Sequence, residues 1–493
     1  MSDELMELPE GWGKVSLAEI TYRITKGTTP TSLGFNFADE GILFVKVESI
    51  QNQQINHALC TFIGIEADEA LARSRLQEGD VLFSIAGTLG RIAIVQKEDL
   101  PANTNQALAI IRLINPIFSH YIAEVLSSHL LAESIKDSGR GVGLQNINLK
   151  QVSEFDIPLP PLNEQRRIVA KIEELRERSQ KARSHLSAIP NLCDKFRQSV
   201  LAAAFRGDLT ADWREQNPDV EPASVLLERI RRDRHDRKSP ESVDSSQLPE
   251  LPEGWMWTPL EEIASHRSGI AFKSAEFTNI GIQVIRLSNV YKGQLDLTRD
   301  PVFLPDKYAI DSFTLKANDI VVSQTGTRFK RDYGNFVLIP NNCPKLFLNQ
   351  RLLAVSCHHL INPEYIVFAS KLKSYQDHFF SHETGGVNQG NVGVSGVMKG
   401  LVPLAPQKEA QILVKRIKTA FEYICRVELI HRRNEDNLNY LDRSILAKAF
   451  RGELVEQDPN DEPASVLLDR IRAEREQQAQ GKKGKRIMKT TST

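Results

Sequence analysis

The residues of this chain that could do chemistry are spaced in ways that favour none of the familiar catalytic or metal sites. Cys357, His358 and His359 are adjacent, so they cannot easily converge on one metal ion, and no second pair of ligands is spaced to complete a site. The glycines of 139–143 follow a helical, serine-rich stretch rather than a strand, which argues against a dinucleotide site. The sequence also lacks the G-x-x-x-x-G-K-[ST] and G-x-S-x-G motifs. These patterns predict a protein that binds rather than a catalyst, with no metal or cofactor of its own.

One short loop carries a denser set of basic and aromatic side chains. The segment TGTRFKRDYG holds Arg328, Lys330 and Arg331, interleaved with Phe329 and Tyr333. Guanidinium groups can bind the edges of guanine bases, so the loop is a candidate for contact with nucleic acid. The solvated tip of a hairpin explains the same composition, and the sequence leaves both interpretations open.

Length and composition indicate the kind of molecule that must position these side chains. The chain has 493 residues, of which 41% are hydrophobic and 25% charged, enough for more than one folded core. Its net charge of −1 supplies no global basic field, so any binding of anions depends on local patches. The irregularly spaced cysteines, the acidic start and the absence of a long apolar run predict a cytoplasmic protein that crosses no membrane.

The chain is one module of about 240 residues present twice. LPEGW begins at Leu8 and again at Leu251. The helix-like EPASVLLERIR at 221–231 returns as EPASVLLDRIR at 462–472, and shorter matches follow in the same order between these points. A duplicated chain of this kind tends toward pseudo-twofold symmetry.

Each module begins with a part that mixes strands and helices. Short apolar runs separated by Gly and Asn turns predict strands. INP at 114–116 and again at 361–363 places an asparagine cap and a proline at the first turn of a helix. INPEY at 361–365 superficially resembles an amino-methyltransferase motif, but the second proline is missing and a repeated helix cap explains it better.

Each module ends in a long helix with a narrow apolar seam. After a proline-rich stop, apolar residues recur at alternating steps of three and four, which is the heptad pattern of a coiled coil. The predicted seam consists of Ile168, Ile172, Leu175, Leu186 and Ile189 in the first helix and Leu413, Ile417, Ile424, Val427 and Leu438 in the second. Each helix could cover its own domain, but the narrow seam favours pairing of the two. Pro190 is expected to kink the first helix.

LPEGW, the duplicated module, IPLPPLNEQRRIVAKIEEL, SILAKAFRGEL and PASVLLDRIRAER resemble the specificity subunit of Type I restriction-modification systems. The resemblance covers essentially the full length. It implies an α+β fold in which two target-recognition domains are separated by two long helices that form an antiparallel coiled coil, with a pseudo-twofold internal repeat. The corresponding boundaries are 1–155 and 251–400 for the recognition domains, 156–238 and 401–478 for the helical repeats, 239–250 for a linker, and 479–493 for a disordered basic tail.

The same resemblance implies a non-catalytic subunit that recognises DNA. Each recognition domain reads one half of a bipartite, asymmetric site in double-stranded DNA, and the coiled coil sets the spacer. Two modification subunits carry S-adenosylmethionine and methylate adenine, and restriction subunits add an ATP- and Mg²⁺-dependent nuclease, so no cofactor is expected on this chain. The alternatives are a non-catalytic two-headed scaffold that binds a protein or peptide ligand and a standalone enzyme, which the missing motifs disfavour.

The repeat also sorts the residues that could contact DNA. A residue shared by both recognition domains cannot tell two half-sites apart, so shared residues are scaffold or phosphate contacts and unshared loops are better candidates for reading bases. Asn105-Gln106 recurs as Asn349-Gln350, which favours a structural turn over adenine recognition. Lys46 and Arg286 occupy matching positions and could bind phosphate or pair internally. The candidate set is Lys26, Thr28, Lys46, Thr88, Arg91, Arg140, Arg267, Lys273, Arg286, Thr327, Arg328, Lys330, Arg331 and Asn391.

Overall fold

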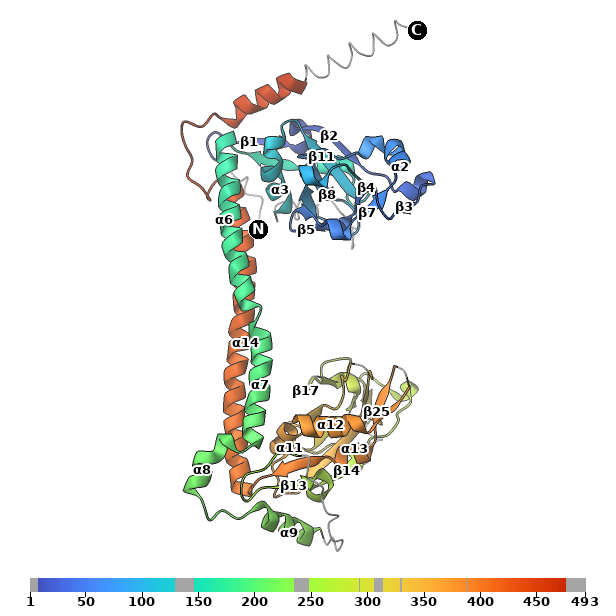
Figure 1. The fold of residues 1–493 in the computed structure, drawn as a ribbon, viewed down its shortest axis with the longest axis vertical. Helices are drawn as coiled ribbons and strands as arrows, with labels where there is room; N and C mark the ends of the chain where they lie inside the picture. Colours follow the sequence, from blue (N-terminus) through green and yellow to red (C-terminus); the bar gives the residue numbers. More distant parts are fainter. Residues whose placement is uncertain are drawn as a thin grey trace. The chain divides into compact units, whose positions relative to one another are not determined.

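The chain forms two compact units, and each unit combines segments from both halves of the chain (Figure 1). Unit 1 comprises Met1–Ser187 with Arg432–Thr493, and unit 2 comprises Ala188–His431. We call 8–155 head 1, in unit 1, and 251–400 head 2, in unit 2. The computed structural model describes residues 8–128, 146–234, 248–291, 293–305, 314–328, 330–386 and 388–475. The tail at 479–493 and most of the linker at 239–250 lie outside these residues, and the domain boundaries remain predictions.

Head 1 is built on two four-stranded sheets. The first contains, in order, β2 (Thr21–Lys26), β11 (Leu108–Leu113), β8 (Val81–Ser84) and β9 (Ile92–Ile94), all antiparallel. The second contains, in order, β10 (Ala102–Thr104), β4 (Ile42–Val45), β7 (Thr61–Ile63) and β3 (Phe37–Ala38), with β10 parallel to β4. A separate antiparallel pair joins β1 (Gly13–Ser16) to β12 (Asp156–Leu159). The central strands are short apolar runs buried on both faces, as β8 shows.

Head 2 repeats this arrangement. One antiparallel sheet contains, in order, β14 (Ala264–Ser268), β23 (Leu352–Cys357), β19 (Ile320–Ser323) and β21 (Phe336–Leu338). Another contains β18 (Phe303–Leu304), β15 (Ile282–Ile285) and β22 (Leu346–Leu348), with β15 parallel to β22. The pair β13 (Met256–Pro259) and β26 (Leu401–Leu404) matches β1 and β12. The repeat in the sequence is therefore a repeat of topology, which confirms the predicted α+β fold.

The two INP motifs cap helices, as predicted. The Asn115 side chain accepts a hydrogen bond from the N–H of Ile117, two residues before α3 (Ser119–Ser127). In head 2, Asn362 accepts from the N–H of Glu364 at the start of α11 (Pro363–Ala369). Each side chain satisfies a backbone donor that the helix itself leaves without a partner.

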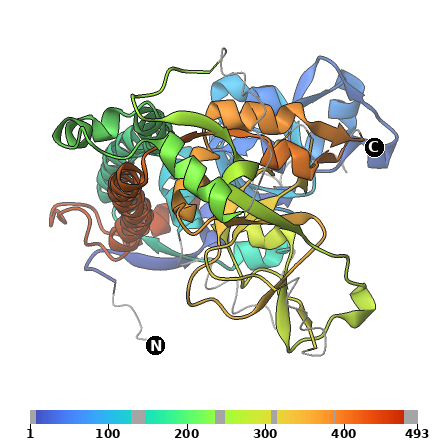
Figure 2. The ribbon, with the colours of Figure 1, turned by 90° about the horizontal axis from the view of Figure 1, so that it is seen from below.

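Long helices pair in an antiparallel manner within each unit (Figure 1), and Figure 2 shows them side by side. They are α6 (Leu162–Leu186), α7 (Ile189–Phe205) and α14 (Gln407–Phe450), whose last part belongs to unit 1. In unit 1, Arg183 of α6 donates to Asp442 at 2.7 Å, and in unit 2, Arg197 of α7 donates to Glu428 at 2.7 Å. Residue numbers rise on one helix as they fall on the other. The break between α6 and α7 falls next to Pro190, in agreement with the expected kink.

The predicted seam is buried along most of its length. Its buried members are Ile168, Ile172, Leu413, Ile417 and Ile424, and its partly buried members are Leu175, Leu186, Ile189 and Leu438. Val427 corrects the prediction, because its side chain is 45% exposed. Glu428 occupies the facing position instead, where its carboxylate binds Arg197. Arg197 of α7 lies against α14 at this level, and its guanidinium is satisfied by the Glu428 carboxylate and not by an apolar side chain such as Val427.

Each copy of the repeated EPASVLL segment lies at the end of one half of the chain and contacts the head that belongs to the other half. In unit 2, α9 (Ala223–Asp233) begins where the N–H of Ala223 donates to the Gly254 carbonyl at 2.8 Å. In unit 1, the equivalent helix at 464–475 begins where the N–H of Ala464 donates to the Gly11 carbonyl at 2.8 Å. Both glycines belong to LPEGW motifs. The two repeated motifs are therefore the two sides of one repeated contact.

Candidate nucleic-acid interface

Both heads close a variable loop with the same hydrogen bond. In head 1 the loop follows β8, and the N–H of Arg91 donates to the Ser84 hydroxyl at 2.7 Å. In head 2 the loop follows β19, and the N–H of Asn335 donates to the Ser323 hydroxyl at 3.0 Å. The serine at the end of each strand thus fixes the base of its loop.

Each loop also pairs with a segment that precedes the last short helix of its head. Ala86 forms an antiparallel bridge with Asn146 in head 1. In head 2, β20 (Thr325–Gly326) pairs with β25 (Gly390–Val392), which pairs with β24 (Glu383–Gly385). Between the matched closures, the loop spans 85–90 in head 1 and 324–334 in head 2. The two heads thus share the hydrogen bond and the strand pairing that fix the ends of the loop, but the loops themselves differ in length and sequence. This is the pattern expected of two surfaces that recognise different ligands.

The head 2 loop and its neighbouring strand gather five of the predicted DNA-contact residues. They are Thr327, Arg328, Lys330, Arg331 and Asn391, of which the last three are exposed and the first two are partly buried. The Asn391 side-chain oxygen accepts from the Thr325 hydroxyl at 2.9 Å. The Arg331 guanidinium lies 4.8 Å from the centre of the Phe380 ring. The guanidinium of Arg331 is therefore held by a specific contact with an aromatic ring.

Three predicted contact residues are bonded inside the heads. Arg91 donates to the Val47 carbonyl at 3.0 Å, and Arg267 forms an ion pair with the buried Asp319. Arg286 donates to the carbonyl of Asp300, so internal pairing is the better supported of its two interpretations. A guanidinium engaged in this way must break its bond before it can reach a base, which makes these residues weaker candidates for reading DNA.

The remaining candidates lie outside the head 2 loop and its neighbouring strand. Lys26, Thr88 and Lys273 are exposed, Thr28 and Lys46 are partly buried, and Arg140 lies outside the described residues. The ammonium of Lys46 lies 4.3 Å from the centre of the Phe37 ring. The Asn105 side chain accepts from the N–H of Ala107 at 3.0 Å, which supports the interpretation of Asn105-Gln106 as a turn.

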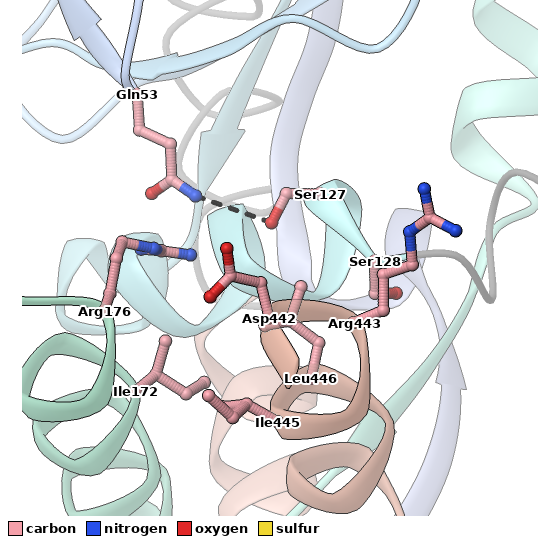
Figure 3. A pocket seen from close by; sticks show the side chains of 9 residues that line it. All are labelled: Gln53, Ser127, Ser128, Ile172, Arg176, Asp442, Arg443, Ile445 and Leu446. Atoms are coloured by element: carbon pink, nitrogen blue, oxygen red, sulfur yellow. Dashed lines mark hydrogen bonds between the residues drawn. The ribbon is translucent and has the colours of Figure 1, made fainter. Parts of the chain in front are cut away.

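A groove of about 450 Å³ lies in unit 1 between head 1 and the paired helices (Figure 3). Its lining is Gln53, Ser127, Ser128, Ile172, Arg176, Asp442, Arg443, Ile445 and Leu446. Arg176 donates two hydrogen bonds to Glu124 at 2.6 and 2.7 Å, which fixes its guanidinium. In Figure 3, Ile172 and Ile445 lie between the helices, and Gln53 donates to Ser127 at 3.4 Å on the side of the head. The groove is lined by charged groups of both signs and by apolar groups.

The adjacent histidines of head 2 meet a residue from the other half of the chain. Asp233, the last residue of α9, lies with its carboxylate 3.5 Å from Nε2 of His358 and 4.0 Å from Nε2 of His359. Burial lowers the pKa of His358 below its usual range. The spacing of the sequence could not reveal Asp233, because α9 is brought to this loop by folding. Asp233 and His359 are exposed, and the cluster joins α9 to head 2.

Comparison with known proteins identifies the class to which these features belong. Residues 9–185 match the family described as Type I restriction modification DNA specificity domain. The EcoKI specificity subunit of Escherichia coli strain K12 is 26% identical over 95% of this chain and 96% of its own length. The StySPI specificity subunit of Salmonella potsdam is 24% identical over 95% and 96% of the two chains.

Solved structures share the fold. The HsdS subunit from Thermoanaerobacter tengcongensis has a TM-score of 0.52 at 18% identity, and it covers 92% of this chain and 100% of its own. A chain from a structural study of complex assembly and conformational transition of the type I R-M system has a TM-score of 0.61 at 19% identity over 91% and 100%. Residues 9–185 thus carry the specificity domain of Type I restriction-modification systems, and along 95% of its length the chain is similar to specificity subunits of these systems. It is a non-catalytic subunit. Among the described residues, no helix is long and apolar enough to cross a membrane.

Proposed function

We propose that the chain reads a bipartite, asymmetric site in double-stranded DNA, with one half-site for each head. The observation that carries this proposal concerns the loop after β8 in head 1 and its counterpart after β19 in head 2. The ends of the two loops are fixed by the same hydrogen bond and a similar strand pairing, but the loops differ in length and in side chains. A shared loop closure is expected of two heads that bind the same kind of ligand, and different loops are expected where the two heads recognise different DNA sequences. The basic groups of the head 2 loop are the kind of donors that guanine edges accept.

The paired helices set the spacer between the two half-sites in this proposal. Their support is the buried seam within each unit together with the ion pairs of Arg183 with Asp442 and Arg197 with Glu428. A helix rises about 1.5 Å per residue, so the length of the pair fixes a distance as a strut does.

The helices also provide surfaces for partners. Large apolar side chains exposed on α7 and α14 include Leu192, Phe196, Tyr423, Val427 and Ile430. Exposed apolar groups of this size on a water-facing coiled coil indicate contact with another chain. We assign this surface to two modification subunits, which supply S-adenosylmethionine and the adenine-methylating site. Restriction subunits would then add the ATP- and Mg²⁺-dependent nuclease.

Methylome sequencing tests the proposal. Cells that express this chain with its modification partner should show methylated adenines on opposite strands of a motif with two defined halves and an undefined spacer. Cells that express the partner alone should lack the mark. A mark that persists without this chain would contradict the proposal.

A further inference from the structure

The basic loop of head 2 rests on one carboxylate from a distant part of the chain. The Tyr333 hydroxyl donates to Oε1 of Glu383, and Nε of Arg328 lies 3.5 Å from Oε2 of the same residue. Nη1 of Arg328 donates to the Gly385 carbonyl at 3.4 Å. The Glu383 side chain is 15% exposed and Tyr333 is 3% exposed. The largely buried carboxylate of Glu383 thus binds the Tyr333 hydroxyl through one oxygen and faces the Arg328 guanidinium with the other.

Two glycines allow this contact to form. A Cβ on Gly390 would overlap both the Tyr333 hydroxyl and the Glu383 carboxylate. A Cβ on Gly326 would meet the Tyr333 ring at 2.6 Å. Strands β20 and β25 can approach Tyr333 because they carry glycine at these positions. The contacts of Tyr333 with Glu383 therefore depend on the backbone of the paired strands and not only on mobile surface side chains.

The rest of the loop is held from the same side. The Tyr333 ring packs edge-on against Phe380 with ring centres 5.3 Å apart, and the guanidinium of Arg331 lies over Phe380. The N–H of Thr327 donates to the Asp332 carboxylate at 2.7 Å. Side chains that are already ordered lose less conformational freedom on binding, so such a loop is suited to selective contacts.

We infer that Glu383 is a positioning residue through which Arg328 recognises a guanine in the half-site of head 2. The inference rests on the proposed function. Nε of Arg328 faces Glu383, and the contact of Nη1 with the Gly385 carbonyl is long at 3.4 Å, so the fork of Nη1 and Nη2 can exchange this weak contact for the acceptors of a base. A guanidinium fork donates two parallel hydrogen bonds to O6 and N7 of guanine in the major groove. A carboxylate close to DNA repels phosphates, and in Glu383 this charge is compensated by the two groups that it holds, the Tyr333 hydroxyl and the Arg328 guanidinium.

The sequence of the methylated site tests this inference. Glu383→Gln and Arg328→Ala, each expressed with the modification partner, should relax the motif at one G·C pair of one half-site. The loss of one bidentate contact predicts roughly a 10-fold or greater fall in discrimination at that pair. The other half-site and the spacer should remain unchanged and serve as an internal control. Tyr333→Phe, which removes only the hydroxyl, should relax the same position to a smaller degree.

Lys330→Ala is the matched control in the same loop, because its exposed ammonium can neutralise phosphate without reading a base. It should lower methylation uniformly across sequences. Uniform loss of methylation in Glu383→Gln, or an unchanged motif, would overturn the positioning role while leaving the proposed function intact. A wild-type methylome without a two-part motif would overturn both.

Discussion

At the scale of single residues, the two halves of the chain treat one repeated glutamate differently. Trp12 donates its indole N–H to Glu164 at 3.0 Å, and Trp255 donates to Glu409 at 2.9 Å. Both carboxylates are buried at the start of the long helices. The second oxygen of each carboxylate has different hydrogen-bond partners in the two halves, and this difference follows from the sequence after the Phe-Arg-Gly end of each half's long helices.

Glu409 has two further partners that Glu164 lacks. Its Oε1 accepts from Thr210 at 2.7 Å and binds Arg214. In the second half of the chain, Val455 occupies the position of Thr210 and the following segment is shorter. Oε1 of Glu164 accordingly has no hydrogen-bond partner among the described residues. Burial raises the pKa of Glu164, and the bond from Trp12 acts against that shift.

This difference predicts opposite outcomes for matched substitutions. Glu409→Gln removes the charge that Arg214 binds and should lower the free energy of unfolding by about 2 kcal/mol. Glu164→Gln retains an acceptor for Trp12 and removes a poorly compensated charge, so it should be neutral or stabilising. Thermal unfolding of the two variants beside the wild-type protein measures both effects. Equal losses of stability would contradict the account.

The raised pKa of Glu164 also predicts a dependence on pH. A carboxyl whose pKa is higher in the folded state stabilises the fold when protonated, and this contribution is lost as the pH rises through the folded-state pKa. Wild-type protein should therefore lose stability relative to Glu164→Gln as the pH rises from below 4.5 toward neutrality. Melting temperatures of both proteins over that range provide the measurement. A difference that is constant with pH would show that Glu164 does not titrate differently on unfolding.

At the scale of elements, the contrast between Ile424 and Val427 separates the seam from the outer face of α14. Ile424→Asp places a charge in a buried position and should destabilise unit 2 by about 3 kcal/mol or more. Val427→Asp changes an exposed position and should alter stability by no more than about 0.5 kcal/mol. If the outer face receives a modification subunit, Val427→Asp should nevertheless weaken co-purification with it. Similar destabilisation by the two substitutions would place Val427 back on the seam.

Much of the architecture could be predicted because it depends on local patterns. Repeated INP caps, the helix break near Pro190 and the buried Ile168 and Ile417 follow from spacing and backbone chemistry alone. Val427 could not be placed, since a heptad count assumes the register that the helix pairing itself decides. The DNA-contact candidates could not be ranked from the sequence for a similar reason. Whether an arginine is free or bonded to a carbonyl depends on strands far apart in the sequence, as with Arg91.

Glu383 shows the same limit at the candidate site. No spacing connects it to Arg328 or Tyr333, because the pairing of β20 with β25 and β24 brings them together. A signal was present in the glycines at 326 and 390, which allow the close approach, but glycine is also common in loops simply because it fits tight turns. The sequence could identify the basic loop, and the fold was needed to find the residue that positions it.

At the scale of the whole molecule, each half of the chain is completed by the other. The helix at 464–475 contributes buried Leu467, Leu468 and Ile471 to the core of unit 1, and α9 contributes its equivalents to unit 2. The long helices likewise pair one segment from each half. In the proposed function, a molecule assembled in this way offers two similar surfaces to its partners on one chain, while the two loops differ.

The central claim is that the paired helices separate two independent half-site readers, and changing the length of the pair tests it most directly. Seven residues inserted after Arg183 in α6, with seven inserted before Asp442 in α14, add one heptad to both strands of the coil. The pair should lengthen by about 10 Å, at most about three base pairs of DNA. Methylome sequencing of an active variant should find both half-sites unchanged and the spacer between them longer. An active variant that methylates sites with the original spacer would contradict the account.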